Sequence, residues 1–501
     1  MTNNVTQSRK ALTDEITQAQ KKLDEINAEF RKSEICKICN RAREAWLSAQ
    51  RGIGKARSLL YMATQREQRA MCLGIIRSIL TGDQEGSAAQ IGLVCPEYQM
   101  YMDVWAKRAE ARMSIPEFRK SADMQQAATL KLINLQRNCG KKTIVFMAPY
   151  FSKSRLSDGY FQRVQAIDDL FGEDLLAVYC SWLDSDEDSG LWRYTVWDER
   201  HIEISFPQQD EVSWIRVQQI IHAAGIVYHH SITFADERIT CSPSLLKIVD
   251  LHGAYPEELR MYGRTWRARQ SERQEQLAVK NAQYILCVSN QMLVHIRKKY
   301  CGNVGGKYII LPILKQSLLT QEKEFNKPYN GIYEVVYAGG MQKWQGIKEM
   351  RNAICKAQGD FFYRICTAEP QKFLLGWSSS NKPKNMQVQS LTPQEMTEVY
   401  HKAHFGFVLR KDDTINRVSC PTKLMEYIAM GVVPILKSIY LGDFVSEGMQ
   451  YVSLENFIAG RLPQPQQRDE MARTNYNVLM LMNERFLLGA TELKKVISGG
   501  E

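Results

Sequence analysis

The stretch Ser419–Ile435 decides the fold class and reads Ser-Cys-Pro-Thr-Lys-Leu-Met-Glu-Tyr-Ile-Ala-Met-Gly-Val-Val-Pro-Ile. Pro421 suits the first position of a helix, since its missing N–H would have no partner there. Apolar side chains recur with helical spacing, and Gly431 is a favourable helix stop. The apolar run Val432–Leu436 follows directly and is typical of a buried strand. Helix followed by buried strand is the repeating unit of α/β proteins.

Similar alternation extends over two thirds of the chain in two series. The first series of predicted strands comprises Thr143–Pro149, Leu176–Tyr179, Ile226–His229, Leu245–Asp250, Tyr284–Val288 and Tyr308–Leu311. The second comprises Glu334–Tyr337, Phe361–Cys366, Phe405–Leu409 and Val432–Leu436, with helices at Pro393–Ala403 and Gln467–Val496. The polar stretch Gln316–Asn330 between the series is typical of a linker. The pattern predicts two doubly wound, Rossmann-like domains facing one cleft.

The first 142 residues differ from the rest of the chain in charge and in the spacing of their apolar residues. They hold 24 Lys and Arg against 15 Asp and Glu, whereas the rest of the chain holds 41 against 40, so the net charge of +10 is concentrated in the first third. Apolar residues at alternating spacings of four and three predict an all-α domain, either a coiled coil or a helical bundle. This seam consists of Leu12, Ile16, Ala19, Leu23, Ile26 and Phe30.

Bulk properties exclude several classes of protein. With 44% hydrophobic and 24% charged residues in 501, the chain is neither collagen-like nor wholly disordered. No apolar run is long enough for a membrane span, and the polar N-terminus does not resemble a secretory signal. Twelve scattered cysteines favour a reducing compartment, so we expect a cytoplasmic protein. A zinc site built from Cys36, Cys39, Cys72 and Cys95 is a weak alternative.

The start of the helix in Ser419–Ile435 is a predicted anion site. Amides near Thr422 and Lys423 have no partner within the helix, and the helix dipole favours negative charge there. Glu426 lies one turn further on, where its carboxylate would accept hydrogen bonds from the vicinal hydroxyls of a ribose. These groups fit a nucleoside diphosphate. The alternative is a capped helix with a surface glutamate.

Three other segments follow predicted strands, where ligands bind in α/β sheets. Glycines in Tyr337–Gly346 would let backbone amides approach a phosphate, with Lys343 adding charge, although such a pair of glycines is also an ordinary turn. Asp250 and His252 are two apart on an extended segment, so they point the same way. Asp158-Gly159-Tyr160 would form a loop whose glycine permits close approach of an acceptor.

In order and spacing, these segments resemble the retaining glycosyltransferases of family 4, which have the GT-B fold, and most closely the bacterial members that act on cell-surface polysaccharides. The resemblance covers about residues 143–500 and leaves 1–142 without a counterpart. Pro421–Ile435 is similar to the donor-binding helix of the family, and Tyr337–Gly346 to the loop that opens its second domain. Asp250–Glu257 and Val288-Ser289 are similar to its first-domain motifs.

The resemblance implies a nucleoside diphosphate sugar donor, either a UDP-sugar or a GDP-sugar, with no bound metal or other cofactor. It places Glu426 at the ribose hydroxyls, His252 beside the donor sugar, and Gly159 in the acceptor-side loop. With the motifs, it predicts donor binding by Gly339, Gly340, Lys343, Arg410, Pro421, Thr422, Lys423 and Glu426. The predicted catalytic residues are His252 and Asp250, and the acceptor-side residues are Asp158, Gly159 and Tyr160.

Two features depart from the family pattern. Its Glu-x7-Glu motif puts a first glutamate at Val418, which cannot accept a hydrogen bond from a sugar through its side chain. Gln345 and Gly340 stand where the family commonly has lysine and arginine. The missing positive charge would then come from Lys343, Arg410, Arg417 or Lys423.

We therefore expect a helical domain over residues 1–140, an acceptor-side domain over 141–325, a donor-binding domain over 326–465 and a C-terminal helix over 466–501. The leading hypothesis is a glycosyltransferase acting on a glycan or lipid-linked acceptor. Its basic helical domain would bind the inner face of the membrane, a protein or a second copy of the chain, and no nucleic acid. The alternatives are a helical scaffold carrying a degenerate glycosyltransferase-like domain, and a GT-B-fold epimerase or phosphorylase.

Overall fold

The computed structural model describes residues 116–156, 158–183, 192–208, 211–241, 245–302, 304–320, 325–375, 377 and 383–499. The described residues include one helix of the predicted N-terminal helical domain, α6, Pro116–Asn138. The apolar seam and the four N-terminal cysteines lie outside the described residues. The described residues fall into two compact units, and the unit made of Gly140–Trp182, Arg200–Glu203 and Val217–Glu501 contains the candidate site described below.

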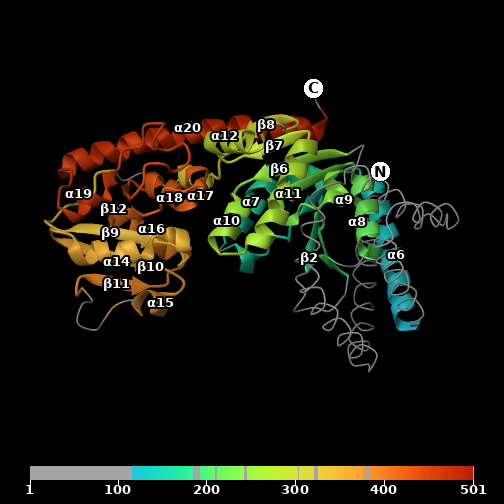
Figure 1. Ribbon diagram of the computed structural model, residues 1–501, viewed down its shortest axis with the longest axis horizontal. Helices are drawn as coiled ribbons and strands as arrows, with labels where there is room; N and C mark the ends of the chain where they lie inside the picture. The colour runs from blue at the N-terminus through green and yellow to red at the C-terminus, as the bar shows by residue number, and fades with distance from the viewer. Residues whose placement is uncertain are drawn as a thin grey trace. The chain divides into compact units, whose positions relative to one another are not determined.

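The first half of this unit contains most strands of a mainly parallel sheet (Figure 1). Its strand order is β3-β4-β2-β1-β5-β6-β7-β8. The strands are β1 Lys142–Met147, β2 Leu175–Leu183, β3 Arg193–Val196, β4 His201–Pro207, β5 Ile226–His230, β6 Leu246–Leu251, β7 Tyr284–Cys287 and β8 Lys307–Ile310. The helices are α7 Gly159–Asp168, α8 Glu211–Ala224, α9 Glu237–Thr240, α10 Tyr255–Met261, α11 Thr265–Asn281, α12 Asn290–Lys299 and α13 Ser317–Thr320.

The second half holds a six-stranded sheet with the order β11-β10-β9-β12-β13-β14, and its strand pairs are parallel. The strands are β9 Tyr333–Ala338, β10 Phe361–Cys366, β11 Met386–Gln389, β12 Phe405–Val408, β13 Val433–Leu436 and β14 Val452–Ser453. The helices are α14 Ile347–Lys356, α15 Pro370–Leu374, α16 Pro393–Lys402, α17 Thr414–Arg417, α18 Thr422–Ala429, α19 Leu454–Ile458 and α20 Pro465–Ser498. This strand order is that of a doubly wound sheet, whose ligand crevice lies where β9 and β12 diverge.

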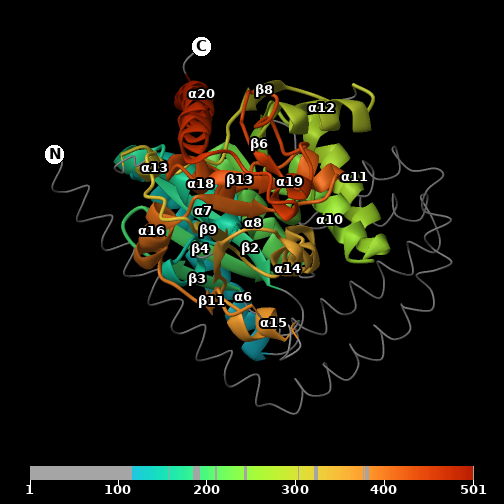
Figure 2. The same ribbon diagram turned by 90° about the vertical axis from the view of Figure 1, so that its left-hand side faces the viewer.

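The two faces of the second sheet are covered by different helices, with α14 and α16 on opposite sides (Figure 2). Alternate residues of β9 point to opposite faces. Val335 and Tyr337 therefore pack with Met350 of α14, whereas Val336 packs with Tyr400 of α16 and with α18. Both faces are buried, which explains why the strand is apolar throughout.

The long helix α20 belongs to both halves. It packs against α18 and β13 of the second half and against β8 of the first (Figure 1). The close approach of α20 to β8 requires a glycine at position 489, because a β-carbon there would lie 2.5 Å from the carbonyl oxygen of Ile310. None of the described helices is both long and apolar enough to cross a bilayer.

The sequence-predicted doubly wound halves are confirmed, with differences of detail. Strands β3, β4, β11 and β14 were not predicted, because they are short or carry polar side chains among the apolar ones. Pro421 is the N-cap and the helix begins at Thr422, one residue later than predicted. The predicted linker contains the helix α13. The predicted domain boundaries remain predictions.

Candidate functional site

The glycine loop follows β9 at the carboxyl edge of the second sheet. Gly339 has φ of 147°, a conformation that side chains disfavour, and a β-carbon there would lie 2.9 Å from the Nζ of Lys423. Its amide donates to the carbonyl of Cys366 at 3.0 Å, so it is not available to a ligand. The amide of Gly340 has no acceptor among the described residues. The Gly340 amide is therefore a free donor beside a lysine.

Lys423 is the lysine that lies against this loop, and it is 7% exposed. Its Nζ donates to the side-chain oxygen of Gln345 at 2.8 Å and lies 4.1 Å from the ring centre of Tyr337. Burial and the nearby Arg410 hold the pKa of Lys423 well below its ordinary value. Gln345 occupies the position where the resembling family has lysine, and here it holds a lysine from α18 instead.

Arg410 supplies a second cation at the end of β12. Its Nη1 donates to the Oγ of Ser419 at 3.2 Å, while its buried Nε has no hydrogen-bond partner among the residues that the structure describes. Burial lowers the pKa of Arg410 to about 10, so it remains charged at neutral pH. Lys423 and Arg410 thus meet where β9 and β12 diverge, the position at which a doubly wound sheet binds ligands.

Helix α18 presents its N-terminus to the same place. The amides of Thr422 and Lys423 have no acceptor within the described part of the chain. Glu426 is partly exposed, accepts a hydrogen bond from the hydroxyl of Tyr400 at 2.9 Å and lies 3.8 Å from Lys315. Free amides, a helix dipole and two cations form an anion-binding site, with a carboxylate one helical turn away.

In the first half, Asp250 is wholly buried at the end of β6. Arg163 of α7 donates to both of its oxygens, from Nε at 2.8 Å and from Nη2 at 3.0 Å. The hydroxyl of Tyr228 donates at 2.9 Å. Burial alone would raise the pKa of Asp250, but Arg163 brings it below its ordinary value. Asp250 is therefore an ionised anchor for the strand end, with both oxygens occupied.

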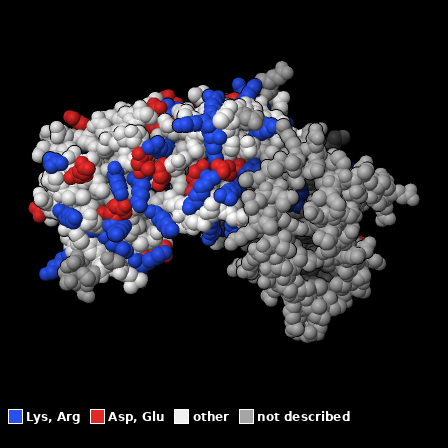
Figure 3. All heavy atoms as spheres, viewed as in Figure 1, with Lys and Arg blue, Asp and Glu red and all other residues white. Residues whose placement is uncertain are grey.

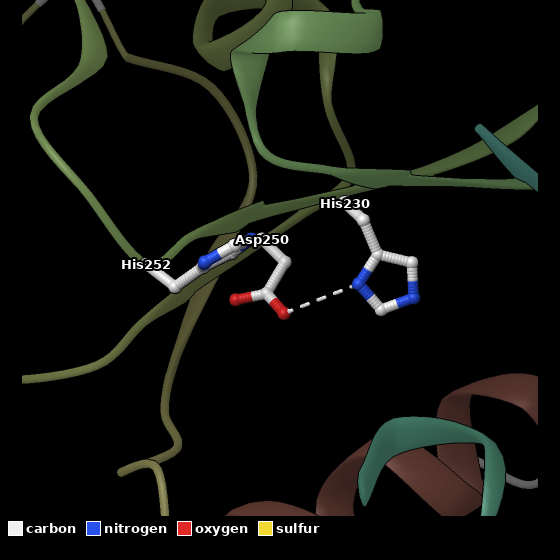
Figure 4. A group of neighbouring side chains, drawn as sticks. All are labelled: His230, Asp250 and His252. Carbon is white, nitrogen blue, oxygen red and sulfur yellow. Dashed lines mark ion pairs between the residues drawn. The ribbon is translucent and has the colours of Figure 1, made fainter. Parts of the chain in front are cut away.

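His230 and His252 gather around Asp250 (Figure 4). One ligand atom from each of the three residues lies within 4.8 Å of the others, and the Nδ1 of His230 is 3.9 Å from Asp250. Such a group can hold a metal ion in principle. Here, however, the guanidinium of Arg163 already neutralises the carboxylate and would repel a cation. The residues fit a neutral polar network rather than a metal site.

His252 is the member of this network next to the predicted acceptor-side loop. Burial lowers the pKa of His252 to about 4, so the ring is neutral at pH 7, and its Nε2 has no hydrogen-bond partner in the described part of the chain. Its ring lies 5.3 Å from that of Tyr160. Asp158 caps α7 by accepting from the amide of Tyr160, and Gly159 is exposed, with open space where a side chain would stand. The acceptor-side segment Asp158-Gly159-Tyr160 therefore contacts the network of His230, Asp250 and His252 through the side chain of Tyr160.

No protein-family model matches the chain, and no curated protein matches it by sequence. Solved structures do match by fold. Sucrose-phosphate synthase from Thermosynechococcus elongatus is 11% identical, with a TM-score of 0.54 over 72% of this chain and 100% of that one. The trehalose-6-phosphate synthase OtsA is 9% identical, with a TM-score of 0.50 over 71% of this chain and 99% of that one. The chain has the GT-B fold.

Within this GT-B fold, the second half brings together Gly340, Arg410, Thr422 and Lys423 as predicted from the sequence. Lys343 is exposed and lies over the ring of Tyr262, 5.2 Å from its centre. Arg417, the other candidate for the missing charge, pairs with Asp412 on the surface. Lys and Arg elsewhere on the face seen in Figure 3 are interspersed with Asp and Glu.

Two residues of the GT-B halves escaped the sequence reasoning. Arg163 is 87 positions from its partner Asp250 and carried no motif. Glu258 lies on α10 of the first half and interacts electrostatically with Arg410 of the second. The first-domain segment Asp250–Glu257 ends one residue before Glu258, and the sequence does not tell which of the two adjacent glutamates faces the second half. In the structure, Glu257 pairs with Lys299.

Proposed function

We propose that the chain is a retaining glycosyltransferase that moves a sugar from a nucleoside diphosphate sugar to a glycan or glycolipid acceptor in surface polysaccharide biosynthesis, without a metal ion. One observation carries the proposal: Lys423 and Arg410, two buried basic side chains, meet the free amides of Gly340 and Thr422 at the switch point of a doubly wound sheet. Basic side chains and free amides together form a strong site for a diphosphate.

The neighbouring groups support a nucleotide sugar over a bare phosphate. Glu426 lies one turn beyond the anion site and offers carboxylate oxygens to ribose hydroxyls. His252, neutral at physiological pH, would make a hydrogen bond to the donor sugar, and Tyr160 would line the acceptor side. Asp250 would act by fixing the strand end that carries His252, as a positioning residue.

One observation favours the alternative of a non-catalytic scaffold. Val418 stands where the resembling family has a glutamate, and its carbonyl accepts a hydrogen bond from the Oγ of Ser289 at 2.8 Å. A scaffold would bind a nucleotide without turning over a sugar nucleotide. Release of nucleoside diphosphate from a UDP- or GDP-sugar, with and without a glycan acceptor, distinguishes the two functions.

The predicted partners of residues 1–140 are part of the proposal. We expect the full chain to bind anionic vesicles or to self-associate through this region, because its charge is strongly positive. Flotation of the full chain with vesicles of anionic or of neutral phospholipid tests the membrane arm. Equal recovery with the two kinds of vesicle would contradict it.

Calorimetry with UDP, GDP, ADP and CMP tests the nucleotide site. We expect one diphosphate to bind, and Lys423→Met to weaken it roughly ten- to a hundredfold, since a charged hydrogen-bond donor is lost. Lys372→Met, at an exposed lysine of the same half, is the matched control and should bind like the wild type. If no nucleotide binds, the proposed function fails.

The state of Lys423 gives this test a second readout. Its pKa is held well below the ordinary value, and a bound diphosphate would raise that pKa by supplying opposite charge. Binding should therefore draw protons from the buffer. The binding enthalpy should then vary with the ionisation enthalpy of the buffer in the wild type, and less in Lys423→Met.

A further inference from the structure

The donor site lacks an acidic group where the resembling family has one. The Val418 side chain is 2% exposed, and its backbone carbonyl is engaged with Ser289 of the first half. Lys423, Arg410 and the nearby amides are all hydrogen-bond donors. A sugar joined to the distal phosphate carries hydroxyl groups that need acceptors, and a site built only of donors would leave them unsatisfied.

Glu258 brings a carboxylate to this place from the opposite half. It stands on α10, which packs against α17, and α17 leads directly into Val418. Its Oε1 lies 3.1 Å from where a β-carbon would stand on Gly253, the residue after His252. Glu258 also interacts electrostatically with Arg410. The carboxylate is thus bordered by the His252 loop on one side and by the anion site on the other.

The simplest alternative is that Glu258 serves only as a counter-ion for Arg410. The two groups form no ion pair, however, and neither has an ion-pair partner within the described ranges. The Glu258 side chain likewise has no hydrogen-bond partner there. Burial raises the pKa of Glu258, and Arg410 only partly offsets this. The carboxylate is partly exposed and has no protein partner in this part of the chain, so its oxygens are available to a ligand.

We propose that Glu258 accepts hydrogen bonds from hydroxyl groups of the donor sugar, and so takes the place of the glutamate that is missing at Val418. The inference rests on the proposed nucleotide-sugar site and specifies which half of the fold recognises which part of the donor. The second half binds the diphosphate and the ribose, and α10 of the first half binds the sugar. Donor recognition would then require both halves.

Glu258→Gln tests this role, because it removes the charge and keeps the shape. Calorimetry compares UDP with UDP-glucose and GDP with GDP-mannose. We expect the variant to bind the nucleoside diphosphate like the wild type and the matching sugar nucleotide roughly ten- to a hundredfold more weakly. Glu258→Asp retracts the charge by one methylene, and its affinity for the sugar nucleotide should lie between those of the wild type and Glu258→Gln. Glu369→Gln, at an exposed glutamate, is the matched control.

Thermal melting of each variant shows whether it is folded before its binding is interpreted. An equal loss of diphosphate and sugar nucleotide in Glu258→Gln would identify Glu258 as a partner of the anion site and overturn the inference. Unchanged affinity for both ligands would overturn it too. If the wild type binds no diphosphate, the proposed function itself fails, and this outcome is distinct from a failure of the inference about Glu258.

Discussion

At the residue scale, the clearest feature is a set of buried, neutral histidines. Burial lowers the pKa of His229, His252 and His404 to about 4 in each case. His252 therefore cannot act as a general acid at neutral pH, and its contribution is that of a neutral hydrogen-bonding ring. The sequence pointed to His252 through its place after a strand, but its protonation depends on burial and on Arg163, which only the folded chain brings together.

Because of these three histidines, the folded protein should become less stable as the pH falls. In the unfolded chain each binds a proton near pH 6.5, whereas in the folded chain it does so only near pH 4. The unfolded state holds more protons between these values, so the free energy of unfolding should fall as the pH drops from 6.5 to 4. Each histidine should contribute a slope of up to about 1.4 kcal/mol per pH unit.

Denaturant unfolding at a series of pH values measures this slope. His229→Gln removes one of the three groups from a wholly buried position, away from the proposed ligands. Its slope should be shallower than that of the wild type by about one proton. An unchanged slope would mean that His229 is protonated in the folded protein.

At the element scale, the ring of Tyr427 joins helix α18 to the strands β9 and β12. Tyr427 accepts a hydrogen bond from the amide of Ala338, at the end of β9, and its ring lies over Gly406 of β12. The sequence predicted the helix and both strands, because apolar periodicity and glycine stops are local signals. It did not predict this contact, which joins segments about 90 residues apart.

Gly406→Ala tests that arrangement. The new β-carbon would lie 2.3 Å from the ring of Tyr427, so the ring and α18 would have to move. We expect a loss of about 1–3 kcal/mol in the free energy of unfolding, and weaker nucleotide binding because the Gly339 loop shifts. Thermal melting and calorimetry measure the two effects. Gly159→Ala, where a β-carbon meets open space, should melt close to the wild type.

At the scale of the whole molecule, α20 ties the two halves together independently of the linker. It covers β8 of the first half and packs on α18 of the second. A protease site placed at residues 321–324 should therefore cut the chain without separating its parts. After cleavage, the fragments should elute together in gel filtration and come apart only in denaturant. Separate elution in native buffer would show that the linker, and not α20, holds them together.

The same helix sets the order in which the protein can be completed. Ile310 leaves the ribosome about 180 residues before Gly489, yet Ile309 and Leu311 of the first half lie against α20 at Gly489. The first half therefore keeps part of its apolar surface exposed until α20 has been synthesised, near the end of translation. A nascent chain arrested before α20 should depend on chaperones for its solubility, whereas the released protein should not.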